Sequence, residues 1–116
     1  MQKKQPKKPV SVHWKVRLTR VGHKQFLART LSLSAKHLHI ESEYNLKAGE
    51  KVKVEVSALH EGVKKVLVVV GLIRSSILLS NGYSYGLDVM IEKISEADQA
   101  FIDDYIRARE NLIGAR

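Results

Sequence analysis

Apolar and polar side chains alternate along the segment 10–18, and Trp14 is the central apolar residue of the series. A period of two is typical of a β-strand that buries one face, so we expect Trp14 to point into a core. The polar side chains between the apolar ones would share the outer face of the strand. That face carries His13, Lys15 and Arg17.

Further short segments predict strands that continue the same sheet. They are 26–31, 38–40, 52–56, 66–73, 77–80 and 83–91. Segment 66–73 has the sequence VLVVVGLI, which is apolar at nearly every position, so we expect a central strand buried on both faces. Gly71 within it predicts a bulge or a sharp bend. Turns are predicted at 21–23 and 60–62, and Asn81-Gly82 is the strongest short hairpin signal.

The pattern changes to a helical period after residue 94. Ser95 and Asp98 have the spacing of a capping box, although Asp98 replaces the usual Glu or Gln. Apolar residues then recur at helical spacing, at Phe101, Ile102, Tyr105, Ile106, Leu112 and Ile113. An amphipathic helix must cover an apolar surface, and the open end of the sheet is the simplest one. We therefore expect a mainly β fold, a small antiparallel barrel of six or seven strands with one C-terminal α-helix.

The chain divides into a short tail and one domain. Residues 1–9, MQKKQPKKP, contain four lysines and two prolines and almost no apolar side chain, which predicts a flexible basic N-terminal tail. The remaining residues, 10–116, would form the barrel with its helix. A chain of 116 residues is long enough for one domain with one core.

Positive charge is concentrated in the first third of the chain. The net charge is +8, and the first 40 residues hold ten Lys or Arg and no acidic residue. The other 76 residues hold ten basic and twelve acidic residues, a balance of −2. Such asymmetry favours an anionic partner, which could be a nucleotide, a nucleic acid, a membrane surface or an acidic protein.

Several classes of protein are disfavoured by composition. The absence of cysteine excludes disulfides and thiolate metal sites and fits a reducing compartment. The N-terminus lacks the apolar run of a secretory signal, and segment 66–73 is far shorter than the roughly 20 residues needed to span a bilayer. We therefore expect a cytoplasmic protein that does not insert into membranes.

Catalysis and metal binding find little support. No G-x-S-x-G, G-x-x-x-x-G-K or H-E-x-x-H pattern occurs, so we expect no enzyme activity and no catalytic residue. His37 and His39 have the spacing of a metal-binding pair on one strand face, and His60 or Glu41 would have to supply a third ligand. Such pairs are more often surface or barrel-rim side chains, so we expect no metal site.

Nucleic-acid binding is a further alternative. The basic face with His13, Lys15 and Arg17, together with the lysine tail, could follow a phosphate backbone. However, only seven residues are aromatic, and most occupy predicted core positions, which leaves no set for base stacking. A solvated outer strand face explains the pattern better.

The order of the elements resembles the PilZ domain, a bacterial module that binds cyclic di-GMP. A basic N-terminal tail leads into a strand, a serine-containing loop precedes a short apolar strand, and an amphipathic helix closes the chain. The segment YSYGLDVMIEKISEADQAFIDDYI is most similar to the last core strand and helix of that family. The resemblance runs from about Lys3 to Arg109 and implies the same barrel with a C-terminal helix.

Two ligand motifs of the family are replaced here. The family's R-x-x-x-R motif corresponds to lysines, and its D/N-x-S-x-x-G loop aligns with residues 32–37, where only Ser34 matches. Ser32 replaces Asp or Asn, and His37 replaces Gly. A register that starts at Thr30 is an alternative, but it fits the following strand less well. Lysine cannot form the paired hydrogen bonds of arginine, and each lost bidentate guanine contact is worth about 1–3 kcal/mol.

The resemblance implies a non-catalytic regulatory module that binds cyclic di-GMP, more weakly than intact members do, and relays the signal to a protein partner. The ligand-binding residues that it implies are Lys3, Lys4, Lys7, Lys8, Ser32, Ser34 and His37. Cyclic di-GMP would be a ligand, and no cofactor is expected. One alternative is a ligand-independent adaptor that docks on a partner protein, and nucleic-acid binding is a weaker one.

Overall fold

The structure is a computed structural model that describes residues 9–22 and 24–114, with side chains as far as Asn111. The four lysines that the family resemblance assigns to the ligand, Lys3, Lys4, Lys7 and Lys8, therefore lie outside the described residues. Almost all of the predicted tail, 1–9, lies outside them too. Pro9, the first described residue, is exposed.

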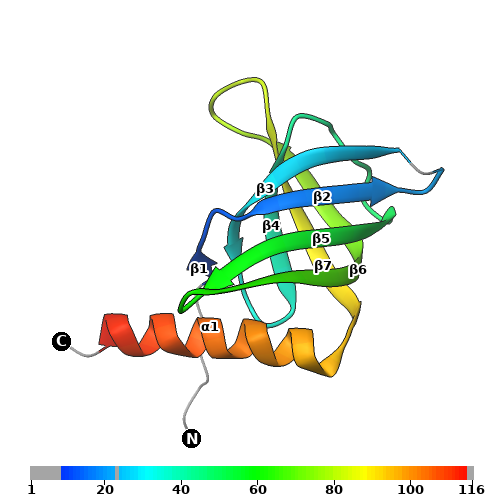
Figure 1. Cartoon of the computed structure of the whole chain (residues 1–116). Coiled ribbons are helices and arrows are strands. Elements are labelled where there is room, and N and C mark those ends of the chain that lie inside the picture. Colours follow the sequence, from blue (N-terminus) through cyan, green and yellow to red (C-terminus); the bar gives the residue numbers. More distant parts are fainter. Residues whose placement is uncertain (1–8, 23, 115–116) are drawn as a thin grey trace, which may run out of the picture.

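Within the described residues, seven strands form one antiparallel sheet, and a single helix follows them (Figure 1). The elements are β1 (Val10–Ser11), β2 (Lys15–Arg20), β3 (Gln25–Leu33), β4 (His37–Ser42), β5 (Lys51–His60), β6 (Val63–Leu78), β7 (Tyr85–Ile94) and α1 (Glu96–Gly114). Their order in the sheet is β1-β3-β2-β5-β6-β7-β4, and β4 also pairs with β3. This last pairing closes six strands into a barrel, with β1 as an extra strand. The predicted mainly β barrel with a C-terminal helix is confirmed.

The barrel interior is filled by the inward-facing residues of the alternating strands. Leu18, Ile40, Val54 and Leu87 are completely buried there, and Trp14 is 8% exposed. Full burial of one such aliphatic side chain stabilises the fold by about 1.5–3 kcal/mol. The inward orientation that the alternation predicts for Trp14 is therefore confirmed.

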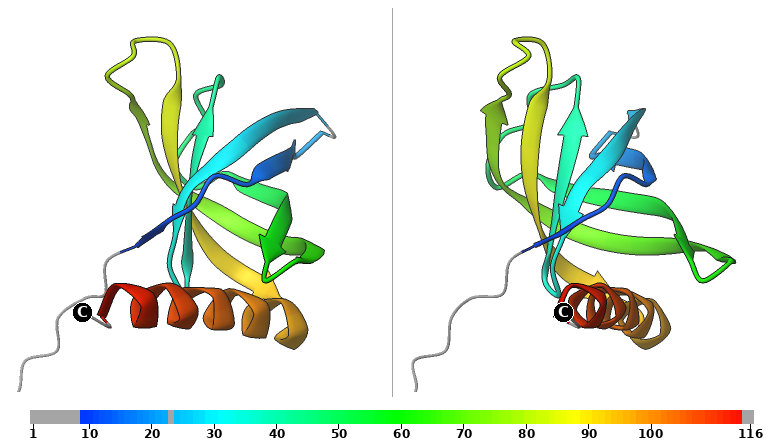
Figure 2. Two further views of the ribbon diagram at one scale, coloured as in Figure 1. Left: turned by 60° about the vertical axis from the view of Figure 1, so that its left-hand side comes forward. Right: turned by 90° about the vertical axis from the view of Figure 1, so that its left-hand side faces the viewer.

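Helix α1 covers one end of the barrel (Figure 2). Ile102 is completely buried, and the Tyr105 ring contacts the Trp14 ring with centroids 4.7 Å apart. The Ser95 hydroxyl accepts a hydrogen bond from the Asp98 N–H at 3.1 Å, as expected for a helix cap. The Asp98 carboxylate does not complete a capping box. It accepts a hydrogen bond from the Val68 N–H of β6 at 3.0 Å and so ties the helix to the barrel.

The single strand expected over 10–18 is instead interrupted between β1 and β2. At the break, the Thr30 hydroxyl accepts a hydrogen bond from the Trp14 N–H at 2.7 Å and donates one to the Val12 carbonyl at 2.5 Å. The Thr30 side chain of β3 thus serves as the hydrogen-bond partner of both backbone groups, the Trp14 N–H and the Val12 C=O. Apolar alternation continues through the break because Val12 and Trp14 both remain buried.

The prediction that segment 66–73 is buried on both faces is wrong. Leu67 and Val69 point into the barrel and are almost fully buried, whereas Val66 is 57% and Val68 is 40% exposed on the outer face. A barrel strand has only one interior face. A run of apolar residues does not show whether the strand belongs to a barrel or to a central strand covered on both faces. The irregularity predicted at Gly71 is confirmed by a shift in the β6–β7 register between Val70 and Gly71.

The turn predicted at Asn81-Gly82 is present, but the connection is longer than a two-residue hairpin. Gly82 has a φ of 83°, and the Asn81 side-chain oxygen accepts hydrogen bonds from the N–H groups of Tyr83 and Ser84. Strand β7 therefore begins at Tyr85, and Tyr83, which the alternation places on the buried face, is 73% exposed.

Candidate functional site

The serine-containing loop is the short turn between β3 and β4, and it lies next to α1 (Figure 2). The Ser34 N–H donates a hydrogen bond to the His37 carbonyl at 2.9 Å, which closes the turn. The Ile91 N–H of β7 donates to the Lys36 carbonyl at 2.8 Å, and the Gln99 side chain of α1 donates to the Ala35 carbonyl at 3.1 Å. Three elements therefore fix the turn backbone.

Four polar side chains meet on the outer face of β3, β4 and β7 beside this turn, and we call them the outer polar cluster: Ser32, His37, His39 and Asp88. The register places His39 opposite Ser32 on one side and opposite Asp88 on the other. The Ser32 hydroxyl lies 2.9 Å from His39 Nδ1. Asp88 Oδ1 lies 2.9 Å from His37 Nδ1 and 3.6 Å from His39 Nε2.

The outer polar cluster is accessible to a ligand. The side chains of His37 and His39 are each 36% exposed, and that of Asp88 is 28% exposed. Asp88 Oδ2 takes part in no hydrogen bond within the described part of the chain, so it is free to accept one. A carboxylate that is held by neighbours and keeps one open oxygen suits a ligand that presents N–H groups.

Ser32, His39 and Asp88 have the residue types of a catalytic triad but not its geometry. A nucleophile needs a base within hydrogen-bond reach, and that base needs a third group hydrogen-bonded to it. Asp88 Oδ1 lies 3.6 Å from His39 Nε2, beyond hydrogen-bond distance, and is hydrogen-bonded to His37 instead. The cluster therefore lacks the chain of hydrogen bonds that a catalytic triad requires.

Neither His60 nor Glu41, the two residues considered as a third metal ligand, is available to complete a site with His37 and His39. The His60 ring packs edge-on against Phe101 under the helix, with centroids 5.9 Å apart. Glu41 Oε1 accepts a hydrogen bond from Arg29 Nε at 3.0 Å, and its Oε2 accepts one from the Ser84 hydroxyl at 2.7 Å. Among the described residues, no three histidine or acidic side chains are grouped to hold a metal ion.

Of the seven residues that the family resemblance assigns to the ligand, Ser32 and His37 belong to the outer polar cluster. Ser34 lies on the adjoining turn and is partly buried. Strand β1 pairs Val10 with Leu33, so the described chain begins beside the same turn. Asp88 is a member of the outer polar cluster that the sequence analysis does not single out. The alternation in YGLDVM places it on the outer face of its strand, but the long-range pairing of β4 with β7 brings it next to His39.

No helix within the described part of the chain has the length and hydrophobicity needed to cross a bilayer.

His13, Lys15 and Arg17 are exposed, as the alternation predicts for an outer face.

No family model and no curated protein matches this sequence, but solved structures share its fold. The Bacillus subtilis inhibitor of motility, MotI/DgrA, superposes with a TM-score of 0.82 at 14% identity, over 100% of this chain. Apo MrkH from K. pneumonia gives 0.69 at 13% identity over 92% of this chain. The PilZ domain of YcgR from Escherichia coli, solved with cyclic di-GMP, gives 0.65 at 14% identity over 95%.

The chain covers about half of two of these structures and nearly all of the third. It spans 56% of the MotI/DgrA chain, 51% of the MrkH chain and 99% of the YcgR PilZ domain. At these identities the likeness establishes the fold and not the ligand. The chain therefore has a PilZ-like fold, as the resemblance of its sequence implies.

Proposed function

We propose that this PilZ-like chain is a cytoplasmic, non-catalytic regulatory module that binds cyclic di-GMP on the outer face of β3, β4 and β7. The observation that carries the proposal is the outer polar cluster. It lies beside the one loop that aligns with a ligand motif of the family, and it is both accessible and internally hydrogen-bonded.

Asp88 supplies what the loop itself lacks. Ser32 stands where the motif has Asp or Asn, and its hydroxyl offers one uncharged oxygen where a carboxylate offers two charged ones. Asp88 provides a carboxylate on the adjacent strand, with Oδ1 held by His37 at 2.9 Å and Oδ2 open. In the proposed complex Oδ2 accepts a hydrogen bond from a guanine N–H group, while the tail lysines attract the phosphates as point charges.

Calorimetric titration of the full chain with cyclic di-GMP, at low and moderate salt and with GTP as the control, tests the proposal. We expect saturable binding of cyclic di-GMP that persists at moderate salt, because a guanine contact is less sensitive to salt than phosphate attraction. Heat that GTP reproduces and that moderate salt removes would contradict the proposal, and so would an absence of heat.

The substitution Asp88→Ala separates guanine recognition from simple charge attraction by the sign of its effect. If Asp88 accepts guanine N–H groups, the change weakens binding by roughly tenfold or more, as expected for about 1–3 kcal/mol. If the ligand is held only by positive charge, removal of a nearby negative charge strengthens binding instead. Asp104→Ala is the matched control, because Asp104 is an exposed carboxylate on α1.

The ligand-independent adaptor is the second candidate function. It is favoured by apolar side chains exposed around a cleft, among them Leu27 at 75% and Tyr83 at 73%. The adaptor requires a protein partner and predicts that Asp88→Ala leaves partner binding unchanged.

A further inference from the structure

An open cleft of about 730 Å³ lies where β3 and β4 separate. The two strands pair from Arg29↔Glu41 to Leu33↔Leu38, and beyond Arg29 strand β3 continues with β2 alone. Figure 2 shows the β2–β3 hairpin diverging from the β6–β7 hairpin on the side of the barrel away from α1. The Arg29–Glu41 ion pair, 3.0 Å long, marks the closed end of the cleft.

The edge of β3 that faces the cleft is unpaired. The Thr30 N–H points to the β2 side, where it donates to the Trp14 carbonyl at 2.9 Å, and the Lys24 carbonyl accepts from the Arg20 N–H on that side. Backbone groups alternate along an antiparallel strand. Gln25 and Leu27 therefore turn their N–H and C=O groups to the cleft, where no strand of the described chain pairs with β3.

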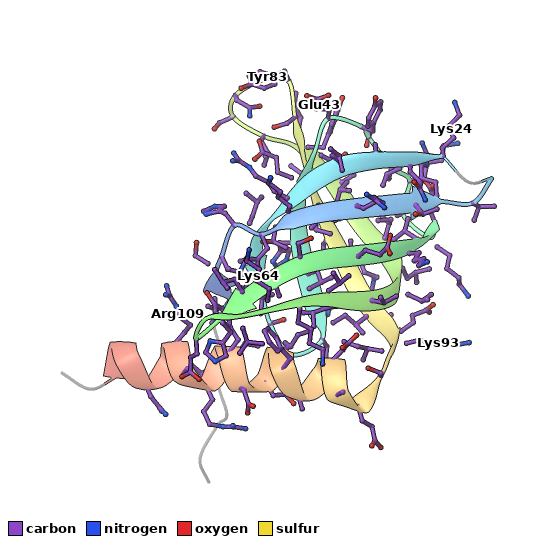
Figure 3. All side chains as sticks on the ribbon, viewed as in Figure 1. Lys24, Glu43, Lys64, Tyr83, Lys93 and Arg109 are labelled. Atoms are coloured by element: carbon purple, nitrogen blue, oxygen red, sulfur yellow. The ribbon has the colours of Figure 1, made fainter. Side chains whose placement is uncertain are left out.

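Apolar and aromatic side chains line both walls of the cleft, next to charged and polar ones. Leu27 is 75% exposed on one wall, and Tyr83 at 73% and Tyr44 at 51% lie on the other. The Phe26 and Tyr44 rings contact each other across the cleft, with centroids 4.7 Å apart. Figure 3 labels Tyr83 at the tip of the β6–β7 hairpin, with Glu43 near it.

Two charged side chains of the cleft have no ion-pair partner among the described residues, and they are Lys15 and the exposed Glu43. Glu41 already accepts hydrogen bonds from Ser84 and Arg29, and both hydrogen bonds lower the pKa of its carboxyl group. Lys15 lines the same cleft, next to Arg29 across the β2–β3 pair, and its ammonium group pairs with no carboxylate among the described residues. An occupant with a carboxylate near this wall would complement it.

We propose that this cleft binds an extended segment of a partner protein, which adds as a strand to the β3 edge at Gln25 and Leu27. The occupant is an extended peptide because the edge offers N–H and C=O groups at the spacing of a strand. Its alternate side chains are apolar and lie against the Phe26–Tyr44 pair, and an acidic residue meets Lys15. The inference concerns a surface other than the outer polar cluster and does not depend on nucleotide binding.

A displayed library of random decapeptides, panned on the full chain, provides the test. We expect enriched sequences with apolar residues at alternate positions and an acidic residue. Their binding should be lost with Leu27→Pro but retained, at reduced affinity, with Leu27→Ala. Proline removes the N–H that faces the cleft and no hydrogen bond to β2, and an edge strand tolerates it there. Circular dichroism and thermal unfolding check that both variants fold.

A chemical control uses the unaltered protein. One enriched peptide is N-methylated at every second amide, in two versions that together cover all amides. We expect one version to bind at least tenfold more weakly and the other to bind normally, because only one set of amides faces β3. In amide exchange, the Leu27 and Gln25 N–H groups should become protected when the peptide binds.

Three results would overturn the inference. They are a library without enrichment, peptides that bind Leu27→Pro as well as the unaltered chain, and equal binding of both N-methylated patterns. Concentration-dependent dimerisation that is abolished by Leu27→Pro would show instead that a second copy of the chain occupies the cleft.

Discussion

Thr30 joins the two parts of the interrupted first strand through its hydroxyl group. The substitution Thr30→Val would leave the Trp14 N–H and the Val12 C=O without their partner in a buried position. We expect it to lower the free energy of unfolding by about 2 kcal/mol or more, because each buried unsatisfied group costs about 1–3 kcal/mol. Urea unfolding at neutral pH measures the change.

Thr19 offers a matched control for Thr30 on the neighbouring strand. Its hydroxyl oxygen is buried and has no hydrogen-bond partner in the described chain. Thr19→Val therefore removes a desolvated polar group without orphaning another, and we expect a neutral or stabilising effect. Equal losses of stability in the two variants would show that the Thr30 hydrogen bonds do not contribute measurably to the free energy of unfolding.

At the scale of the element, β6 depends on Gly71 for its approach to β7. A Cβ atom at this position would lie 2.5 Å from Val89 Cγ1 and 2.9 Å from the Met90 carbonyl oxygen. We expect Gly71→Ala to destabilise the barrel by about 1–3 kcal/mol, because the bulge backbone must shift to relieve the overlap. Thermal unfolding checks this, with Val66→Thr on the exposed face of β6 as the control. A Gly71→Ala loss no larger than that of the control would contradict the predicted overlap.

The elements with a clean local signal could be predicted from sequence. The alternation around Trp14, the Asn81-Gly82 turn and the helical spacing after Ser95 each reflect interactions within a few residues. The two-sided burial expected for 66–73 is wrong because strand composition does not reveal whether a second layer covers the outer face. The break after Ser11 was missed because it depends on the distant Thr30.

The candidate site likewise contains residues that the sequence predicts and one residue that it does not predict. Ser32 and His37 could be located from the spacing of a loop motif. Asp88 becomes their neighbour only through the pairing of β4 with β7, which joins positions 51 residues apart. One sequence does not specify that register, so the carboxylate on which the proposed guanine contact depends became visible only in the folded barrel.

At the scale of the whole molecule, two ion-paired carboxylates link stability to pH. A hydrogen bond from Ser84, and then one from Arg29, lowers the pKa of Glu41, and the Arg20 guanidinium lowers that of Glu50. Groups whose pKa is lower in the folded than in the unfolded chain stabilise the fold above the unfolded value, which is about 4.3 for Glu. That stability is lost as the pH falls through the lower, folded values.

We therefore expect the free energy of unfolding to decline as the pH falls below about 4.3, and urea unfolding between about pH 7 and pH 3 measures it. The double variant Glu41→Gln, Glu50→Gln should be less stable at neutral pH and should depend less on pH in the acid range. An acid dependence that is unchanged in the double variant would assign the effect to other carboxyl groups.

The outer polar cluster draws its side chains from three strands, so it exists only while the barrel is closed. A compound that binds there has affinity for the native chain and none for the unfolded chain, and by mass action it must raise the melting temperature. At a concentration 100 times its Kd the gain is about 2.7 kcal/mol, however weak the binding is. A compound held by tail lysines alone would bind the unfolded chain equally well and leave the melting temperature unchanged. Whether a ligand raises the melting temperature or leaves it unchanged thus reports where on this molecule the ligand binds.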